Sequence, residues 1–372
     1  MQKNLADVIT LFPKELKWEI WKQQKCDIPF SDSVIEFLNS LSALLLKNKE
    51  TRNYPDVATF AFFCRKANSL MLKKQYDAET LRLGRGIIFH IAPSNVPVNF
   101  AYSLVVGLLS GNINIVRVAT QQFPQVDIIV SAIGALSEQY RAVTDRIVLV
   151  RYERGSRATA TFSALCDVRI IWGGDETIAQ IRQSMIPSRA FDVTFADRYS
   201  LAVIDADALI HELDIRKISE FFYNDTYLFD QNACTAPHLL VWLGDSANIQ
   251  VAQKKFWNGV YEVVKEKYTL QPVLAVNKLA TFYRQAVAMP VKKEDTQDNL
   301  IWRVVLEKLP DNIDEFRCTG GYFAEFIASS LDEIAPIIKN KYQTLAYYGI
   351  SREELTNFVL SNRLPGLDRL VS

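Results

Sequence analysis

The sequence predicts an α/β protein with a doubly wound, Rossmann-like parallel sheet followed by a second α/β domain. From Gly84 onward, short apolar runs alternate with helical segments, which is typical of parallel strands buried on both faces. The composition is that of a globular protein, with 49% hydrophobic and 23% charged residues. The length of 372 residues suffices for two domains of ordinary size.

Residues 1–80 are expected to form a helical region. The segments SVIEFLNSLSALLLKN and DVATFAFFCRKANSLMLKKQY place apolar residues three and four positions apart, as amphipathic helices do. Neither segment contains the glycine and proline punctuation that bounds strands. This region therefore precedes the sheet as a helical part of its own.

Strands and helices alternate regularly after residue 80. The expected strands are GIIFHIA, NINIVRV, DRIVLVRY, DVRIIW and RYSLAVID. The expected helices between them are VPVNFAYSLVVGLLSG, PQVDIIVSAIGALSEQY, RATATFSALC and DETIAQIRQSM. This series predicts one domain over residues 81–205. A second domain is expected over residues 206–340, and the tail, residues 341–372, offers one more strand and helix that are expected to return to the first domain.

Charge and composition exclude several classes of function. Lys+Arg equals Asp+Glu at 42 each, so no electrostatic surface for nucleic acid is predicted. No stretch of about 18 uncharged apolar residues occurs, so no membrane span is expected. The beginning MQKNLADVITLFPKE lacks the apolar core of a signal peptide, so the chain is expected to be cytoplasmic. Five scattered cysteines and three histidines argue against a disulfide framework and against a metal site.

Cys234 stands apart from the other cysteines. It lies in YLFDQNACTAPHLLVW among small and polar residues, whereas Cys64 and Cys166 lie in apolar helical patterns. The setting of Cys234 is typical of a reactive thiol, although on this pattern alone a buried structural cysteine is slightly the more common use. His238, four residues on, is a candidate base or proton donor. The alternative for His238, which its place at the start of an apolar strand favours, is a bond to the backbone.

A ligand site is expected at the carboxyl ends of the strands of a doubly wound sheet. The fingerprint G-x-G-x-x-G is missing, but Gly173 and Gly174 follow the strand DVRIIW and open a helix. Such a pair lets the backbone approach an anion such as pyrophosphate, although a tight turn is the commoner use. Arg117, at the end of NINIVRV, could meet a ribose or phosphate there, or could equally be a solvated strand-end charge.

Taken together, these segments resemble the aldehyde dehydrogenase superfamily, most closely its LuxC-type acyl-CoA reductase branch. The segments that carry the resemblance are HIAPSNVPVNFAYSLVVGLLSGNINIVRVA, DVRIIWGGDETI, FADRYSLAVIDADAL, FDQNACTAPHLL and, more loosely, KYQTLAYYG and LPGLDRLV. The resemblance implies an aldehyde-dehydrogenase-like fold. It makes residues 81–205 an NADP(H)- or NAD(H)-binding domain and residues 206–340 a catalytic domain, with an active site at their junction.

The resemblance also implies roles for individual residues. Cys234 matches the nucleophile of the family, and Asn95 matches the asparagine whose amide helps to form the oxyanion hole. Arg117 falls where relatives place a basic residue against the adenosine ribose or its 2′-phosphate. The other residues that fall at the cofactor cleft of relatives are Ser94, Ala119, Gly173 and Gly174.

One departure from the superfamily bears on the reaction. Aldehyde-oxidising relatives carry a glutamate base in the segment that matches TFADRYSLAVID, where this chain has Phe195 and no glutamate between Glu176 and Glu212. That base activates the water that hydrolyses a thioester enzyme, a step that thioester reduction does not need. The resemblance therefore implies NADPH-dependent reduction of a fatty acyl thioester, on CoA or on a protein, to an aldehyde through an acyl-cysteine.

Two other functions stay open on the sequence. One is a CoA-independent aldehyde dehydrogenase or a reductase of an acyl phosphate. The other is a catalytically silent, cofactor-binding scaffold subunit. The resemblance further implies a homo-oligomer, and acyl-transferring or acyl-activating partner enzymes.

Overall fold

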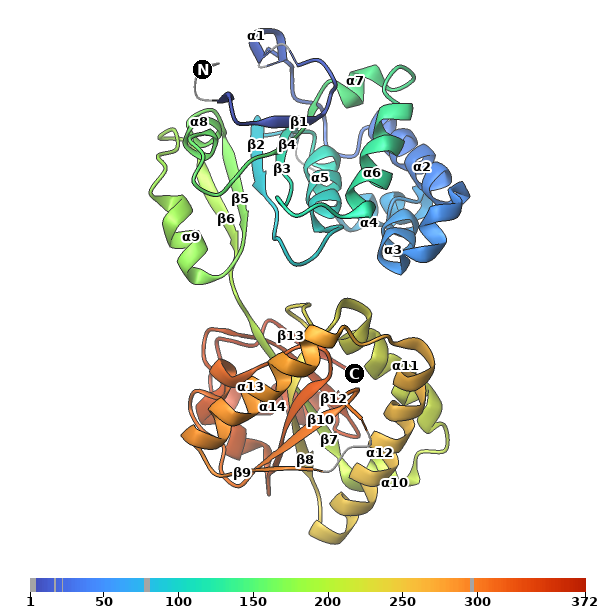
Figure 1. Ribbon diagram of the computed structural model, residues 1–372, viewed down its shortest axis with the longest axis vertical. Coiled ribbons are helices and arrows are strands. Elements are labelled where there is room, and N and C mark those ends of the chain that lie inside the picture. Colours follow the sequence, from blue (N-terminus) through green and yellow to red (C-terminus); the bar gives the residue numbers. More distant parts are fainter. Residues whose placement is uncertain (1–4, 17, 22, 77–80, 295–297) are drawn as a thin grey trace. The chain divides into compact units, whose positions relative to one another are not determined.

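The computed structural model describes residues 5–16, 18–21, 23–76, 81–294 and 298–372 (Figure 1). The chain divides into two compact units, Met1–Ala196 (unit 1) and Asp197–Ser372 (unit 2). Each unit is built on its own, mainly parallel sheet. Among the helices that the structure describes, none combines the length and apolar character needed to cross a membrane.

The sheet of unit 1 has the strand order β1-β4-β3-β2-β5-β6. Its strands are β1 (Ile9–Phe12), β2 (Ile87–Ile91), β3 (Ile113–Arg117), β4 (Ile147–Arg151), β5 (Val168–Trp172) and β6 (Phe191–Phe195). All neighbours are parallel except β1, which joins the edge antiparallel to β4. The chain runs from β2 outward to β4 and then returns to place β5 on the other side of β2. The strand order therefore reverses between β2 and β5, which is where doubly wound sheets bind ligands.

Helices cover both faces of this sheet, as the alternation in the sequence predicts (Figure 1). The helices are α1 (Trp18–Trp21), α2 (Asp32–Lys47), α3 (Pro55–Phe63), α4 (Lys66–Tyr76), α5 (Asn99–Leu109), α6 (Pro124–Ala135), α7 (Arg141–Thr144), α8 (Ala158–Ser163) and α9 (Asp175–Arg182). Val116 and Leu149 face the core shared with α2, α3, α5 and α6. Phe89 and Ile115 face the opposite core, which α8 and α9 complete.

The sheet of unit 2 has the strand order β13-β12-β7-β8-β11-β10-β9. Its strands are β7 (Tyr199–Asp205), β8 (Pro237–Leu243), β9 (Val291–Lys293), β10 (Trp302–Leu306), β11 (Tyr322–Ile327), β12 (Tyr342–Tyr348) and β13 (Arg369–Val371). The helices are α10 (Ala206–His211), α11 (Ile215–Thr226), α12 (Ser246–Lys267), α13 (Pro272–Ala288) and α14 (Arg352–Ser361). Helices α10, α11 and α12 pack on one face of the sheet, and α14 packs on the other.

The boundaries between the units differ from the expected domains in two places. The strand in RYSLAVID, expected to close the first sheet, is β7 and pairs with β8 and β12 in unit 2. The expected return of residues 341–372 to the first domain is not observed, because β12 and β13 extend the sheet of unit 2. An apolar run marks a strand buried on both faces, but it does not say which of two similar sheets the strand joins.

Candidate functional site

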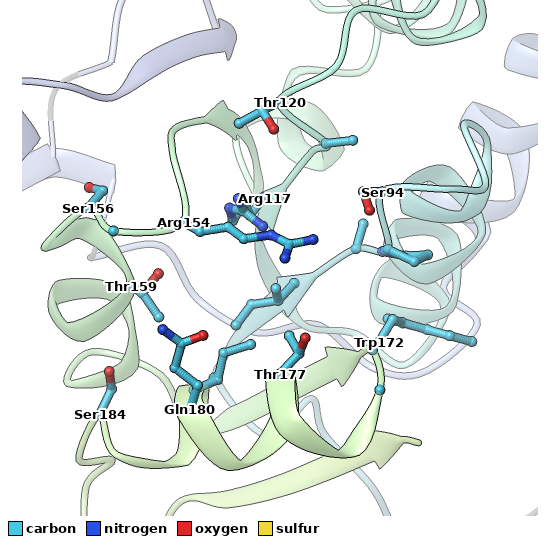
Figure 2. Close-up of a pocket in the computed structure, with 18 of the residues that line it drawn as sticks. Ser94, Arg117, Thr120, Arg154, Ser156, Thr159, Trp172, Thr177, Gln180 and Ser184 are labelled. Carbon is cyan, nitrogen blue, oxygen red and sulfur yellow. The ribbon is translucent and has the colours of Figure 1, made fainter. Parts of the chain in front are cut away.

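A cavity of about 570 Å³ opens at the carboxyl ends of the strands of unit 1 (Figure 2). Its walls are the segments that follow β2, β3, β4 and β5, together with helix α9. The cavity therefore occupies the place where the strand order reverses. The structure brings together here six residues singled out from the sequence, namely Ser94, Asn95, Arg117, Ala119, Gly173 and Gly174.

Arg117 is a buried cation at the end of β3, and only 9% of its surface is exposed. Its Nη2 donates to the carbonyl oxygen of Tyr152 at 3.1 Å, and its guanidinium lies over the Tyr152 ring, 5.0 Å from the centroid. The buried Nε has no hydrogen-bond partner among the residues that the structure describes. Burial lowers the pKa of Arg117, and the nearby charge of Arg154 lowers it further. The alternative of a solvated strand-end charge is therefore wrong, and the unpartnered N–H is suited to an anion.

Arg154 is a second cation of the cavity that the sequence analysis missed. It follows β4, and Figure 2 shows its guanidinium with that of Arg117 in the middle of the ring of lining side chains. None of the described residues that line the cavity is acidic. The hydroxyl-bearing side chains around it are Ser94, Thr120, Ser156, Thr159, Thr177 and Ser184. Two cations among hydroxyl groups, without a carboxylate, form a lining suited to a ligand that carries phosphate.

The glycine pair does not make a left-handed turn. Gly174 is the N-cap of α9 with φ −67°, and the N–H of Gly173 donates to the carbonyl oxygen of Phe195 at 3.2 Å. A Cβ added at Gly174 would have no atom within 4 Å, because this position borders the open cavity. The pair thus leaves room for a ligand beside the helix N-terminus, where the backbone N–H groups favour an anion.

Phe195 forms an aromatic stack with Trp172 at the edge of the cavity. The two ring centroids lie 3.8 Å apart and the planes differ by 9°. Trp172 lines the cavity, and its Nε1 donates to Ser103 Oγ at 3.3 Å. The position at which the resemblance places a glutamate in aldehyde-oxidising relatives thus carries a side chain that cannot accept a proton.

His90 is a buried residue of β2 whose two ring nitrogens are both hydrogen-bonded. Its Nδ1 is hydrogen-bonded to Ser103 Oγ at 2.8 Å and its Nε2 to Asn114 Oδ1 at 3.0 Å. Burial lowers the pKa of His90 to about 4, so the imidazole is neutral at pH 7. Both ring nitrogens are used within the fold, and neither is offered to a ligand.

In unit 2, Cys234 lies on the loop before β8, and it is exposed. Ser200 Oγ donates to its carbonyl oxygen at 2.7 Å, which anchors the loop to β7. Cys64 and Cys166 are fully buried instead, and burial raises the pKa of both thiols, that of Cys166 to about 12. Unlike these two packed cysteines, Cys234 has an accessible thiol on an anchored loop.

The base of the Cys234 loop is held by the side chain of Gln231, which is buried. Its Nε2 donates to the carbonyl oxygens of Pro237 and Tyr322 at 3.0 and 3.1 Å. Its Oε1 accepts from the N–H groups of Gly321 and Tyr322 at 3.0 and 3.1 Å. All four hydrogen-bonding positions of the amide are therefore filled. No pattern near Cys234 in the sequence indicates this clamp, because Gly321 and Tyr322 lie 90 and 91 residues away from Gln231 along the chain.

His238 is the second residue of β8 and is buried. Its ring stacks on Tyr199, with centroids 5.7 Å apart, and is hydrogen-bonded to the backbone of Cys318. Burial, followed by the charge of Arg317, lowers the pKa of His238 to about 3, so it is neutral at pH 7. The structure thus shows the backbone-bonded arrangement that its strand position favours. The cavity residues lie in unit 1, whereas Cys234 and His238 lie in unit 2.

Comparisons with known proteins agree on a family and a fold. The sequence model of the family described as "Acyl-CoA reductase (LuxC)" matches residues 69–304. The curated "Long-chain acyl-protein thioester reductase 2" of Photobacterium leiognathi is 23% identical over 168 residues. That match covers 45% of this chain and 34% of the relative, so the chain spans about a third of the length of this curated relative.

Solved structures with a similar fold are aldehyde dehydrogenases. A 1-pyrroline-5-carboxylate dehydrogenase from Thermus has a TM-score of 0.62 and 16% identity, and the match covers 95% of this chain and 74% of that one. An aldehyde dehydrogenase from Brucella melitensis biovar abortus 2308 has a TM-score of 0.66 and 14% identity, with coverages of 95% and 78%. These likenesses confirm the aldehyde-dehydrogenase-like α/β fold predicted from the sequence. Because the family model matches well over half of the chain, the chain belongs to the LuxC acyl-CoA reductase family.

Proposed function

We propose that this chain reduces a fatty acyl thioester, carried on CoA or on a protein, to an aldehyde with NADPH through an acyl-Cys234 intermediate. The observation that carries the proposal is the exposed thiol of Cys234 on its anchored loop. In a member of an acyl-CoA reductase family, such a thiol has the accessibility that a nucleophile needs. The curated relative is described as a long-chain acyl-protein thioester reductase, which supports a fatty acyl substrate.

The residues of the unit 1 cavity fit NADPH. Arg117 has a buried N–H without a partner and Arg154 adds a second charge, so these two would hold the 2′-phosphate. The space beside Gly174 at the start of α9 would accept the pyrophosphate. The similar dehydrogenase from Thermus binds NAD, which supports a nicotinamide cofactor. Sites for NAD often bind the ribose hydroxyls with a carboxylate, and the described lining offers none, which favours NADP(H) over NAD(H).

The chemistry of the chain's own residues begins at Cys234. Its Sγ, as a thiolate, attacks the acyl carbonyl, the carrier thiol leaves, and an acyl-Cys234 thioester remains. The side-chain amide of Asn95 and the backbone N–H of Cys234 are proposed to donate to the oxyanion, and one such donor is worth on the order of 10²–10³ in rate. NADPH, when bound, supplies the hydride that converts the acyl group to the aldehyde and frees the thiol. His238 is proposed from the sequence as a base. Because His238 is buried and neutral, it would have to act on the Cys234 thiol through other groups.

Phe195 favours reduction over oxidation. A thioester enzyme is hydrolysed to an acid when a base activates water, and the Phe195–Trp172 stack has no group that could do so. This distinguishes the proposal from a CoA-independent aldehyde dehydrogenase. Acyl-transferring or acyl-activating enzymes are proposed as the source of the acyl group, and a homo-oligomer as the working form.

The test is mass spectrometry of the protein after incubation with acyl-CoA in the absence of cofactor. The wild-type chain should gain the mass of one acyl group, Cys234→Ala should gain none, and the control Cys26→Ala should behave as wild type. Adding NADPH should then release the aldehyde. Aldehyde production by Cys234→Ala at the wild-type rate would refute the mechanism. A folded chain whose Cys234 is not acylated would favour the scaffold alternative, and turnover of acyl phosphate or free aldehyde alone would favour the other enzyme.

A further inference from the structure

Helix α13 buries polar side chains and exposes apolar ones. Its fully buried residues are Lys278 and Gln285, whereas Val276 and Val287 are 66% and 90% exposed. Burying an ammonium group is unfavourable by several kcal/mol unless it is hydrogen-bonded. That burial lowers the pKa of Lys278 to about 8. Lys278 and Gln285 lie seven residues apart and hence on one face of the helix. This face therefore packs against polar groups of the fold and forms hydrogen bonds with them.

The side chains of Lys278 and Gln285 form hydrogen bonds with the Gly320–Tyr322 turn, at the beginning of β11. Lys278 Nζ donates to the carbonyl oxygen of Gly320 at 2.6 Å and also to that of Asn299. Gln285 Oε1 accepts from the hydroxyl group of Tyr322 at 2.7 Å. The turn has left-handed φ values of +70° at Gly320 and +89° at Gly321, where only glycine is unstrained. The two glycines therefore set the conformation of the turn, and its hydrogen bonds to Lys278 and Gln285 hold it against α13.

The other side of the same turn holds the base of the Cys234 loop. The N–H of Gly320 donates to the carbonyl oxygen of Asp230 at 3.0 Å, and the N–H of Gly321 donates to Gln231 Oε1 at 3.0 Å. Asp230 and Gln231 have φ values of +52° and +61°, which are unfavourable for residues with a side chain. These bonds thus hold a strained pair of residues that sets the direction in which the chain enters the loop of Cys234.

We propose that Lys278 is a positioning residue for Cys234. Its ammonium group orients the Gly320 carbonyl, the turn presents its N–H groups to Asp230 and Gln231, and these two residues fix the Cys234 loop. The inference rests on the proposed role of Cys234 as the nucleophile. A purely structural role for Lys278 would lower stability and leave the loop and its thiol unchanged in the folded protein.

The chain offers a matched control in Lys255. Its Nζ also donates to two backbone carbonyls of unit 2, those of Ile210 and Glu212 at 2.9 and 2.6 Å, away from the Gly320–Tyr322 turn. Lys278→Met is expected to slow acylation of Cys234 by acyl-CoA about tenfold to a hundredfold, because small misplacements of a reacting group have effects of this size. Lys255→Met should acylate at the wild-type rate, and NADPH affinity should be unchanged in both variants. Lys278→Gln, which retains an N–H donor, should be intermediate, and it serves if the Met variant does not fold.

Hydrogen exchange of the amides of residues 230–236 gives a second readout that needs no substrate. These amides should exchange faster in Lys278→Met than in wild type or Lys255→Met. Wild-type acylation and wild-type exchange in a folded Lys278 variant would overturn the inference. If the wild-type chain is not acylated at all, the proposed function fails, whereas the exchange of the loop amides still decides whether Lys278 holds the loop.

Discussion

Replacing Arg117 by methionine is expected to weaken NADPH binding and to leave NADH binding nearly unchanged. Methionine keeps an unbranched stem for packing and removes the guanidinium, including the buried Nε, for which the described part of the chain offers no partner. The two cofactors differ only in the 2′-phosphate, so a residue that holds this group acts on one and not on the other.

The size of the effect follows from the bonds that would be lost. A hydrogen bond to a charged group contributes about 1.5–3 kcal/mol, which corresponds to roughly tenfold to a hundredfold in Kd. Among the described residues, Arg117 donates to the carbonyl oxygen of Tyr152, and its guanidinium has further N–H donors that could serve a ligand. Arg154 remains in the variant, so part of the preference for NADPH should persist.

The assay is a titration of the purified chain with NADPH and with NADH, followed by the fluorescence of the reduced nicotinamide. Arg182→Met is the control, because Arg182 lies on α9 in an exposed ion pair with Asp192 and is not among the residues that line the cavity. It should bind both cofactors as the wild type does. Equal weakening of NADPH and NADH in Arg117→Met, or no weakening of either, would refute the assignment of Arg117 to the 2′-phosphate.

Two further predictions concern stability. The pKa values of His90 and His238 fall from about 6.5 to about 4 and about 3 on folding, so the unfolded chain binds more protons below pH 6.5. Lowering the pH near pH 5 should therefore reduce the free energy of unfolding by roughly 2.5 kcal/mol per pH unit through the two histidines together, measured by urea unfolding. Replacing either histidine by glutamine should reduce this pH dependence by about half. Arg303 donates to the fully buried Glu325 through Nε at 2.5 Å, so Arg303→Met should destabilise the chain by about 3–5 kcal/mol. Arg303→Lys, which keeps a positive charge beside Glu325, should lose less stability than Arg303→Met, and an equal loss in the two variants would contradict the ion-pair explanation.

The sequence predicted the fully buried strands and missed those with mixed character. Strands β2, β3, β4 and β5 are apolar throughout most of their length, because both faces of the central sheet are covered. In contrast, β10 and β11 carry Arg303 and Glu325 within their sequences WRVVL and YFAEFI. Strand β5 also carries a charge, Arg169, but it stands in the regular alternation of strands and helices, whereas β10 and β11 do not. Edge strand β1 is only four residues long, and β6 is largely half-exposed, so neither gives a clear pattern.

The residues of the candidate site also divide into those that a local sequence pattern predicts and those that it does not. Arg117 and the glycine pair could be found because they lie at or just after the end of a recognisable strand, whereas Asn95 was identified only from the resemblance to the family. Arg154 follows β4 in the same manner, and the rule that parallel strands end at one edge could have identified it. The clamp made by Gln231 on Gly321 joins residues 90 positions apart, and no local pattern predicts such a contact.

The position of β7 has a consequence for the order in which the chain can fold during synthesis. All the strands of unit 1 have been made once the ribosome passes residue 195. Strand β7 follows at once, but one of its edges pairs with β12, and Thr344 N donates to Ser200 Oγ from 144 residues further on. Unit 2 must therefore keep one edge of its first strand unpaired until β12 has emerged, while unit 1 can already be folded.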